Sequence, residues 1–286
     1  MVCIRKLGVL LLIGAFVIVS ALSEASAQSK TSKRSKRKAA AKAPAAKLNP
    51  KQAMADLASP DPAVATTAAK ALASVKSNPA TEALLDGLAL GMHPRAAAAA
   101  LDSLASHGKL KSLDTIMVYA SYRNPKVRAS AVTAAGAIKD SRAQALVLSA
   151  LRDGHVSVRA AAAEAVRDTK LKQGIESLLA LLEIGDEAAA PALAAMADPD
   201  LAREVAELIG KAPDGVVARC LGAILIRPTF KPEEARVQVV RALGKIPGGD
   251  AIEQLTNYVG SVPEKNPRQS RREAETLIER KLTGDN

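Results

Sequence analysis

The sequence predicts an all-α protein, a right-handed α-solenoid of stacked antiparallel helix pairs, from three observations. A phrase with a Pro or Gly turn and a run of alanines recurs about every thirty residues, as in SPDPAVATTAAKALA, NPKVRASAVTAAGAI and DGHVSVRAAAAEAV. The apolar residues after each turn follow helical spacing, with no sustained strand alternation. The helix faces are filled mainly by small residues, which lets helices pack closely. A period of this length is typical of repeats that bury their apolar faces only against neighbours.

The first 27 residues have the pattern of a secretory signal peptide. The basic start MVCIRK precedes an apolar stretch at 7–22, and Ala25-Ser26-Ala27 supplies the small residues of a cleavage site. We therefore expect cleavage near Ala27 and a periplasmic or secreted protein. The alternative is an uncleaved signal that anchors the chain in the inner membrane, although the apolar stretch is short for a spanning helix.

The next segment, 28–51, contains nine basic residues and no acidic one, so it carries a charge of +9, whereas 52–286 carries only +1. Such a composition predicts disorder. Near an anionic envelope surface, each basic residue adds about 1 kcal/mol of attraction. The segment is interpreted as an electrostatic tether, and a solubilising linker is the alternative. A third possibility is binding of an anionic polymer or nucleic acid, although export would separate the chain from nucleic acid. The residues assigned to the tether are Lys30, Lys33, Arg34, Lys36, Arg37 and Lys38.

From 52 to 286 the turns divide the chain into about seven helix pairs with a capping C-terminal helix. Helices are expected where apolar periodicity is bounded by Pro, Gly, Asp or Asn. The first pairs are predicted at 62–75 with 80–90, 95–106 with 110–121, 125–138 with 142–151, and 156–168 with 174–183.

Between 185 and 232 two registers are possible. In one, a first helix begins near Ala189, DPDLAREVAELIG is its partner and DGVVARCLGAILI is the next first helix. In the other, DPDLAREVAELIG is itself a first helix, because it resembles DPAVATTAAKALA. Beyond the interruption IRPTFKPEE, the segments ARVQVVRALGKI and GDAIEQLTNYVG are predicted to form a pair, followed by a charged cap at 268–282.

Superposing the recurring phrases places Arg95, Arg128 and Arg159 in one register, which predicts a ladder of arginines along one edge of the solenoid. A functional interpretation is a row of cations that binds an acidic partner. The structural interpretation is that each Arg pairs with an Asp near a turn, such as Asp140, Asp153 or Asp168, and joins adjacent repeats. The structural interpretation is favoured because the register recurs whatever surrounds it.

The segment YASYR brings together Tyr119, Tyr122 and Arg123 at the end of a predicted second helix. Tyr and Arg are enriched in the energetically dominant parts of protein interfaces, so these three residues are candidates for partner binding. Packing of the turn over the next repeat is the alternative explanation.

No catalytic, cofactor-binding or metal-binding residue is assigned. The three histidines are not spaced as metal ligands, and the sequence has no Gly-rich phosphate loop and no G-x-S-x-G elbow. After signal cleavage Cys220 is the one remaining cysteine, and its apolar surroundings predict a buried, unreactive thiol. These observations predict that the chain is not an enzyme.

With the paired helices and the phrase D/N-P-x-V-R-x-x-A in view, residues 52–282 resemble HEAT repeats, of the short bacterial kind named after phycobilin lyases. The resemblance implies scaffolds and binding modules. Two enzymatic relatives are alternatives. Deoxyhypusine hydroxylase binds iron through His-Glu dipeptides, which this sequence lacks, and bilin lyases are a poor match for an exported chain with few aromatic residues.

Together these features predict an exported, non-catalytic scaffold. It would bind a protein partner of unknown identity on the concave face, formed by the second helices of the pairs, and the basic segment would act as a flexible tether. No small-molecule substrate or cofactor is expected.

Overall fold

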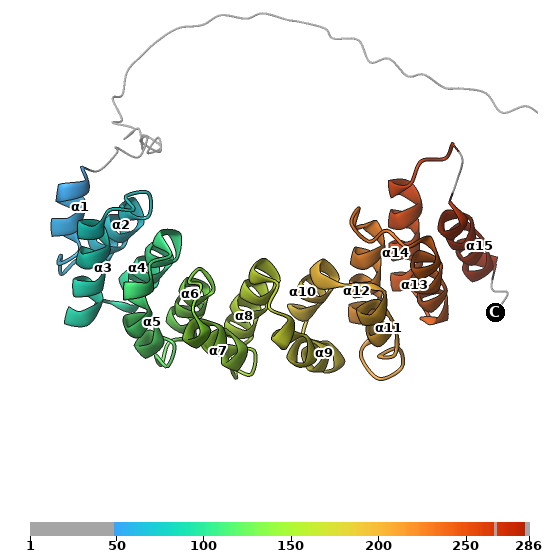
Figure 1. Cartoon of the computed structure of the whole chain (residues 1–286), viewed down its shortest axis with the longest axis horizontal. Helices are drawn as coiled ribbons and strands as arrows, with labels where there is room; N and C mark the ends of the chain where they lie inside the picture. The colour runs from blue at the N-terminus through green and yellow to red at the C-terminus, as the bar shows by residue number, and fades with distance from the viewer. Residues whose placement is uncertain (1–48, 266–267, 284–286) are drawn as a thin grey trace, which may run out of the picture. The chain divides into compact units, whose positions relative to one another are not determined.

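The computed structural model describes residues 49–265 and 268–283, within a compact unit that begins at Lys47 (Figure 1). In these ranges the regular structure is helical, with one isolated bridge between Ile209 and Ala212. The all-α prediction is therefore confirmed. None of the helices described is long and apolar enough to cross a membrane. The predicted signal peptide and the six tether residues lie outside the described ranges.

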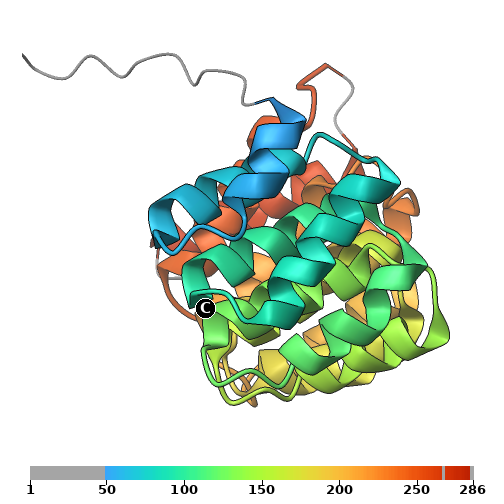
Figure 2. The same cartoon turned by 90° about the vertical axis from the view of Figure 1, so that its left-hand side faces the viewer.

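The helices form two layers, because each repeat contributes one helix to each layer (Figure 1, Figure 2). Even-numbered helices pack against one another in chain order: α2 (Pro62–Leu72), α4 (Pro94–His107), α6 (Pro125–Gly136), α8 (Val156–Thr169), α10 (Ala189–Met196), α12 (Asp214–Ile226) and α14 (Gly249–Ser261). Odd-numbered helices form the other layer: α3 (Asn78–Leu90), α5 (Leu113–Tyr119), α7 (Ser141–Ala150), α9 (Ile175–Glu183), α11 (Pro199–Ala206), α13 (Glu233–Lys245) and α15 (Gln269–Thr283).

Three short elements complete the stack. Helix α1 (Pro50–Asp56) precedes the first pair and packs against α2 and α3. Single 3-10 turns, Leu110–Ser112 and Lys172–Gly174, lead into α5 and α9.

The recurring turn phrase is a helix start. The side chains of Asp61, His93, Asn124 and His155 each accept a hydrogen bond from a backbone N–H in the first turn of α2, α4, α6 and α8. Proline occupies the first helical position in α2, α4 and α6, where its missing N–H costs nothing. The period of the sequence is therefore set by the N-caps.

The even-numbered layer is packed more tightly than a layer of larger side chains allows. A Cβ atom on Gly136 of α6 would lie 2.7 Å from the Cβ of Ala165 in α8. Within this unit, the even-numbered helices follow the inner side of the curve of the stack and the odd-numbered helices the outer side (Figure 1). The prediction that the second helices form the concave face is therefore wrong. Close alanine packing shortens the even layer, so the stack bends toward it.

The structure also decides the register that the sequence left open. Helix α10 packs between α8 and α12 in the even layer, and α11 packs against α13 in the odd layer, so the first of the two registers is correct. The pairing predicted for α13 with α14 is wrong. Because α12 and α14 are neighbours in the even layer, α13 is the second helix of the α12 pair, and α15 completes the pair begun by α14.

Candidate functional site: the turn edge of the helix stack

The turns that join each odd-numbered helix to the following even-numbered helix lie together on one side of the stack, because successive even-numbered helices pack side by side and begin there. We call this side the turn edge. It contains the sequence-predicted arginines and tyrosines.

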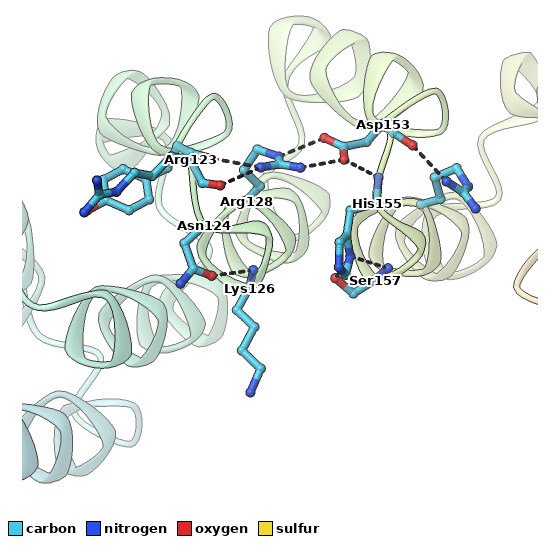
Figure 3. Close-up of polar contacts among 9 residues, drawn as sticks. Arg123, Asn124, Lys126, Arg128, Asp153, His155 and Ser157 are labelled. Carbon is cyan, nitrogen blue, oxygen red and sulfur yellow. Dashed lines mark hydrogen bonds and ion pairs between the residues drawn. The ribbon is translucent and has the colours of Figure 1, made fainter.

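Arg128, in the first turn of α6, reaches the next turn along the edge (Figure 3). Its Nε and Nη2 atoms donate to the two carboxylate oxygens of Asp153 at 2.9 and 2.7 Å, and its Nη1 atom donates to the carbonyl of Tyr122 at 3.0 Å. Both charged side chains are less than a fifth exposed. The hydrogen bonds from Arg128 hold the pKa of the Asp153 carboxyl below its usual value. This bidentate ion pair joins two repeats.

Arg159 repeats the arrangement one repeat further along. Its Nε atom donates to Asp186 at 2.6 Å, and its Nη1 atom donates to the carbonyl of Asp153 at 3.0 Å. The Asp186 side chain is only 3% exposed, and it also accepts a hydrogen bond from the backbone N–H of Ala188. We call the four residues Arg128, Asp153, Arg159 and Asp186 the paired ladder. Its contacts support the structural interpretation of these two arginines.

Arg95 does not belong to this ladder. Arg128 and Arg159 each lie four residues after their N-caps, Asn124 and His155, whereas Arg95 lies only two residues after its N-cap, His93. The four-residue position in α4 is Ala97, which is buried. The predicted three-arginine register is therefore corrected to two. Within the described residues no carboxylate pairs with Arg95, and its side chain is exposed.

The tyrosines of the YASYR segment stack on each other. The ring centroids of Tyr119 and Tyr122 are 5.6 Å apart, with an angle of 23° between the planes. The Tyr119 hydroxyl donates to the carbonyl of Leu88 in the preceding repeat at 2.7 Å, and burial raises the pKa of Tyr119. Both rings are half-buried, and Arg123 beside them is exposed. Tyr119 thus joins repeats, while Tyr122 and Arg123 remain accessible.

Three cations gather at the starts of α4 and α6: Arg95, Arg123 and Lys126. Each is exposed, and within the described residues none of the three has an ion-pair partner. The turns that carry them, 91–95 and 120–126, contain no acidic residue. Cations at a helix N-terminus oppose the helix dipole. We call the two turns that carry these three residues the basic turns, because no carboxylate in the described structure forms an ion pair with any of the three.

Large apolar side chains are also exposed along the turn edge. Leu90, Val118 and Ile184 lie at the ends of α3, α5 and α9 and are 83, 72 and 74% exposed. Ile184 and Arg159 line two adjoining hollows of about 400 and 380 Å³. Three repeats, those of α3, α5 and α9, therefore present aliphatic groups on the same edge, and two shallow hollows lie beside Ile184.

A second groove lies away from the turn edge, between α11 and α13 in the odd-numbered layer. Its volume is about 850 Å³, and Ala202, Ala206, Val239 and Ala242 contribute small apolar side chains to its lining. Charged residues of both signs surround these side chains.

The histidines and the cysteine have structural surroundings. His93 and His155 cap helices, and His107 donates through Nε2 to the carbonyl of Leu72 at 3.0 Å. Cys220 is fully buried, which raises its pKa to about 12. In the part of the chain that the structure describes, no three His, Cys, Asp or Glu residues are grouped to hold a metal ion.

Sequence reasoning missed one polar cluster in the interruption IRPTFKPEE. Arg227 donates to the carbonyls of Ala194 and Ala197 at the end of α10, and Arg236 donates to the carbonyl of Leu225 near the end of α12. Both guanidinium groups lie 5.9 Å from the ring centroid of Phe230. Burial lowers the pKa of Arg227. A basic residue after a helix end is the available sequence signal, since arginine can bind the last carbonyls.

A family model of HEAT repeats matches residues 82–167, which contain the start of the paired ladder and all of the basic turns. These residues are HEAT repeats. The predicted family resemblance is thereby confirmed, and the repeats continue on both sides of the matched residues as stacked helix pairs. No curated protein sequence matches the chain.

The chain is also similar to solved structures. One is the complex of CpcE and CpcF of phycocyanin lyase from Nostoc sp. PCC7120, with 20% identity and a TM-score of 0.46 over 85% of this chain and 97% of that chain. Two are engineered proteins, both 18% identical. Their TM-scores are 0.36 and 0.40, over 82 and 80% of this chain and 97 and 68% of theirs. The prediction that this chain is not an enzyme is wrong as a conclusion from its architecture, because a lyase is among the structures it resembles.

Proposed function

We propose that this HEAT-repeat protein binds a protein partner along its turn edge. The observation that carries the proposal is the pair of exposed aliphatic side chains, Leu90 and Val118, beside the stacked tyrosines, with Ile184 exposed on the same edge two repeats further along. One partner lying along the edge would bury these side chains together. Burial of apolar surface favours association, and accessible Tyr and Arg side chains are typical of the strongest contacts.

The proposal also keeps the basic segment as a tether. Residues 28–51 carry nine positive charges and no negative one, which favours attraction to an anionic envelope surface after export. The tether would raise the local concentration of the solenoid near that surface, and recognition of the partner would remain with the turn edge.

The test is crosslinking and co-purification from envelope fractions with four proteins. They are the full chain, a version lacking residues 28–48, and the variants Val118→Asp and Leu282→Asp. The two point variants are matched, because both introduce a carboxylate at an aliphatic residue near the end of a helix, with exposures of 72 and 70%. Leu282 lies on α15, away from the tyrosines.

We expect one protein to be captured by the full chain, by the shortened version and by Leu282→Asp, and to be lost with Val118→Asp. Equal capture by both point variants would contradict binding at the turn edge. Loss of capture with the shortened version alone would assign recognition to the basic segment.

A further inference from the structure

Resting on the proposed function, we propose that the partner presents an acidic, partly apolar peptide segment, which binds across the basic turns of α4 and α6.

The turn edge changes its charge along the stack. The two turns before α4 and α6 contain Arg95, Arg123 and Lys126 and no acid, whereas the following two turns contain Asp153, Asp186 and Glu187. These three acids pair with Arg128, Arg159 and Arg219. The exposed Arg152 before α8 has no ion-pair partner among the described residues, so the unpaired charge of this part of the edge is positive, and three of its four cations lie at the starts of α4 and α6.

The positive charge is unfavourable for the isolated protein. Arg95 and Lys126 each lie two residues after an N-cap, where the positive end of the helix dipole repels a cation. A partner carboxylate would remove this repulsion and would form charge-assisted hydrogen bonds with the guanidinium groups.

Apolar groups next to the cations favour a peptide over nucleic acid. Val118 and Leu90 are exposed at the ends of the helices that lead into these turns, and Tyr122 is half-buried beside Arg123. Nucleic-acid binding draws its affinity from many phosphate contacts, and the basic turns supply only a few cations. Residues 52–286 as a whole carry a charge of only +1.

The geometry limits where the partner's acids lie. Neighbouring helices in one layer are about 8 to 10 Å apart, and an extended peptide advances about 3.3 Å per residue. A bound segment would therefore place carboxylates about three residues apart, with an apolar residue between them that reaches Val118 or Tyr122.

The experiment uses the full chain and a photoreactive, fluorescent glutamate-alanine peptide of about eight residues, long enough to span both turns. Binding is measured by anisotropy, and the crosslinked residues are mapped by mass spectrometry. Mapping separates adducts in residues 90–126 from adducts in the basic segment, which every variant retains.

The test variant is Arg95→Gln with Arg123→Gln. Its matched control is Lys76→Gln with Lys139→Gln, which removes the same charge from exposed turns on the opposite edge, where neither lysine has an ion-pair partner among the described residues. We expect the yield of adducts at 90–126 to fall about fivefold in the test variant, because two exposed ion pairs with the peptide are lost. In the control the yield should stay within about twofold of the wild type.

An equal fall in both variants would show that net charge alone attracts the peptide and would overturn the proposal. So would adducts confined to the basic segment, or displacement of the peptide by a single-stranded oligonucleotide at lower concentration than by unlabelled peptide. If Val118→Asp abolishes partner capture while the double Gln variant retains it, the turn edge binds a partner but not through acids. The proposed function would then stand and this inference would fail.

Discussion

The paired ladder and the basic turns lie on the same edge of the same stack, yet their arginines have different surroundings. Arg128 and Arg159 lie four residues after an N-cap, and each forms an ion pair with an aspartate in the next turn. Arg95 lies two residues after its N-cap, and the next turn along the stack, 120–124, has no acidic residue. Whether an arginine joins repeats or remains available to a partner therefore depends on its distance from the cap and on the next turn.

The largest expected effect is at the buried end of the ladder. Asp186→Asn keeps an acceptor for the N–H of Ala188 but leaves Arg159 without a counter-charge in a mostly buried position. We expect the free energy of unfolding to fall by about 3 kcal/mol, measured by denaturant titration. The control is Glu187→Gln, which breaks the exposed pair with Arg219 and should cost less than about 0.5 kcal/mol. Similar losses in both variants would remove the distinction between the two pairs.

The next effect is at Arg128. Arg128→Ala removes two hydrogen bonds to Asp153 and one to the carbonyl of Tyr122, so we expect a loss of about 2 kcal/mol. Capture of the partner should change less than thermal stability does. Unchanged melting together with lost capture would reverse the assignment and make Arg128 a binding residue.

A smaller effect should follow pH. Because Arg128 lowers the folded-state pKa of Asp153, the pair stabilises the protein fully above the ordinary carboxyl pKa, and this contribution disappears as the pH falls through the lowered pKa. The difference in melting temperature between the wild type and Arg128→Ala should therefore be constant near neutral pH and shrink in acid. The hydrogen bond to the Tyr122 carbonyl does not titrate and leaves a residual difference, so only a difference that does not shrink at all in acid would mean that charge pairing is not its cause.

The smallest effect is expected in the basic turns. Arg95→Ala removes an exposed cation from a helix N-terminus, so the free energy of unfolding should stay unchanged or rise by about 0.3 kcal/mol. Calorimetry of this variant beside Arg128→Ala measures the contrast directly. A loss comparable to that of Arg128→Ala would place Arg95 among the structural arginines.

Helix positions were predictable because Pro, Gly and capping residues mark every early turn. The register of Arg95 was not predictable, because superposing the repeats on their arginines ignores the N-cap, and the N-cap determines where each helix begins. The pairing of α13 was misjudged because IRPTFKPEE resembles a boundary between repeats. In the structure Arg227 and Arg236 bind carbonyls of α10 and α12, and the ring of Phe230 lies against both guanidinium groups, so the interruption is part of one repeat.

The candidate site was predictable only in part. The tyrosines and Arg123 were found from the composition of one segment, but the exposure of Leu90, Val118 and Ile184 depends on where the helices end in space. The charge change along the edge required knowing that Asp153 and Asp186 are already paired. Long-range pairs between repeats are invisible to local sequence patterns.

The paired ladder also determines how cooperatively neighbouring repeats unfold. Its two ion pairs link α6, α8 and the turn before α10, so opening one of these repeats breaks a contact held by the next. Between the α4–α5 repeat and the α6–α7 repeat no buried ion pair of this kind occurs among the described residues, and the pair that joins them, Arg142 with Asp114, is exposed. Amide hydrogens in α2 to α4 should therefore exchange through openings that leave α6 to α10 closed, which makes the start of α6 a boundary between two cooperative units.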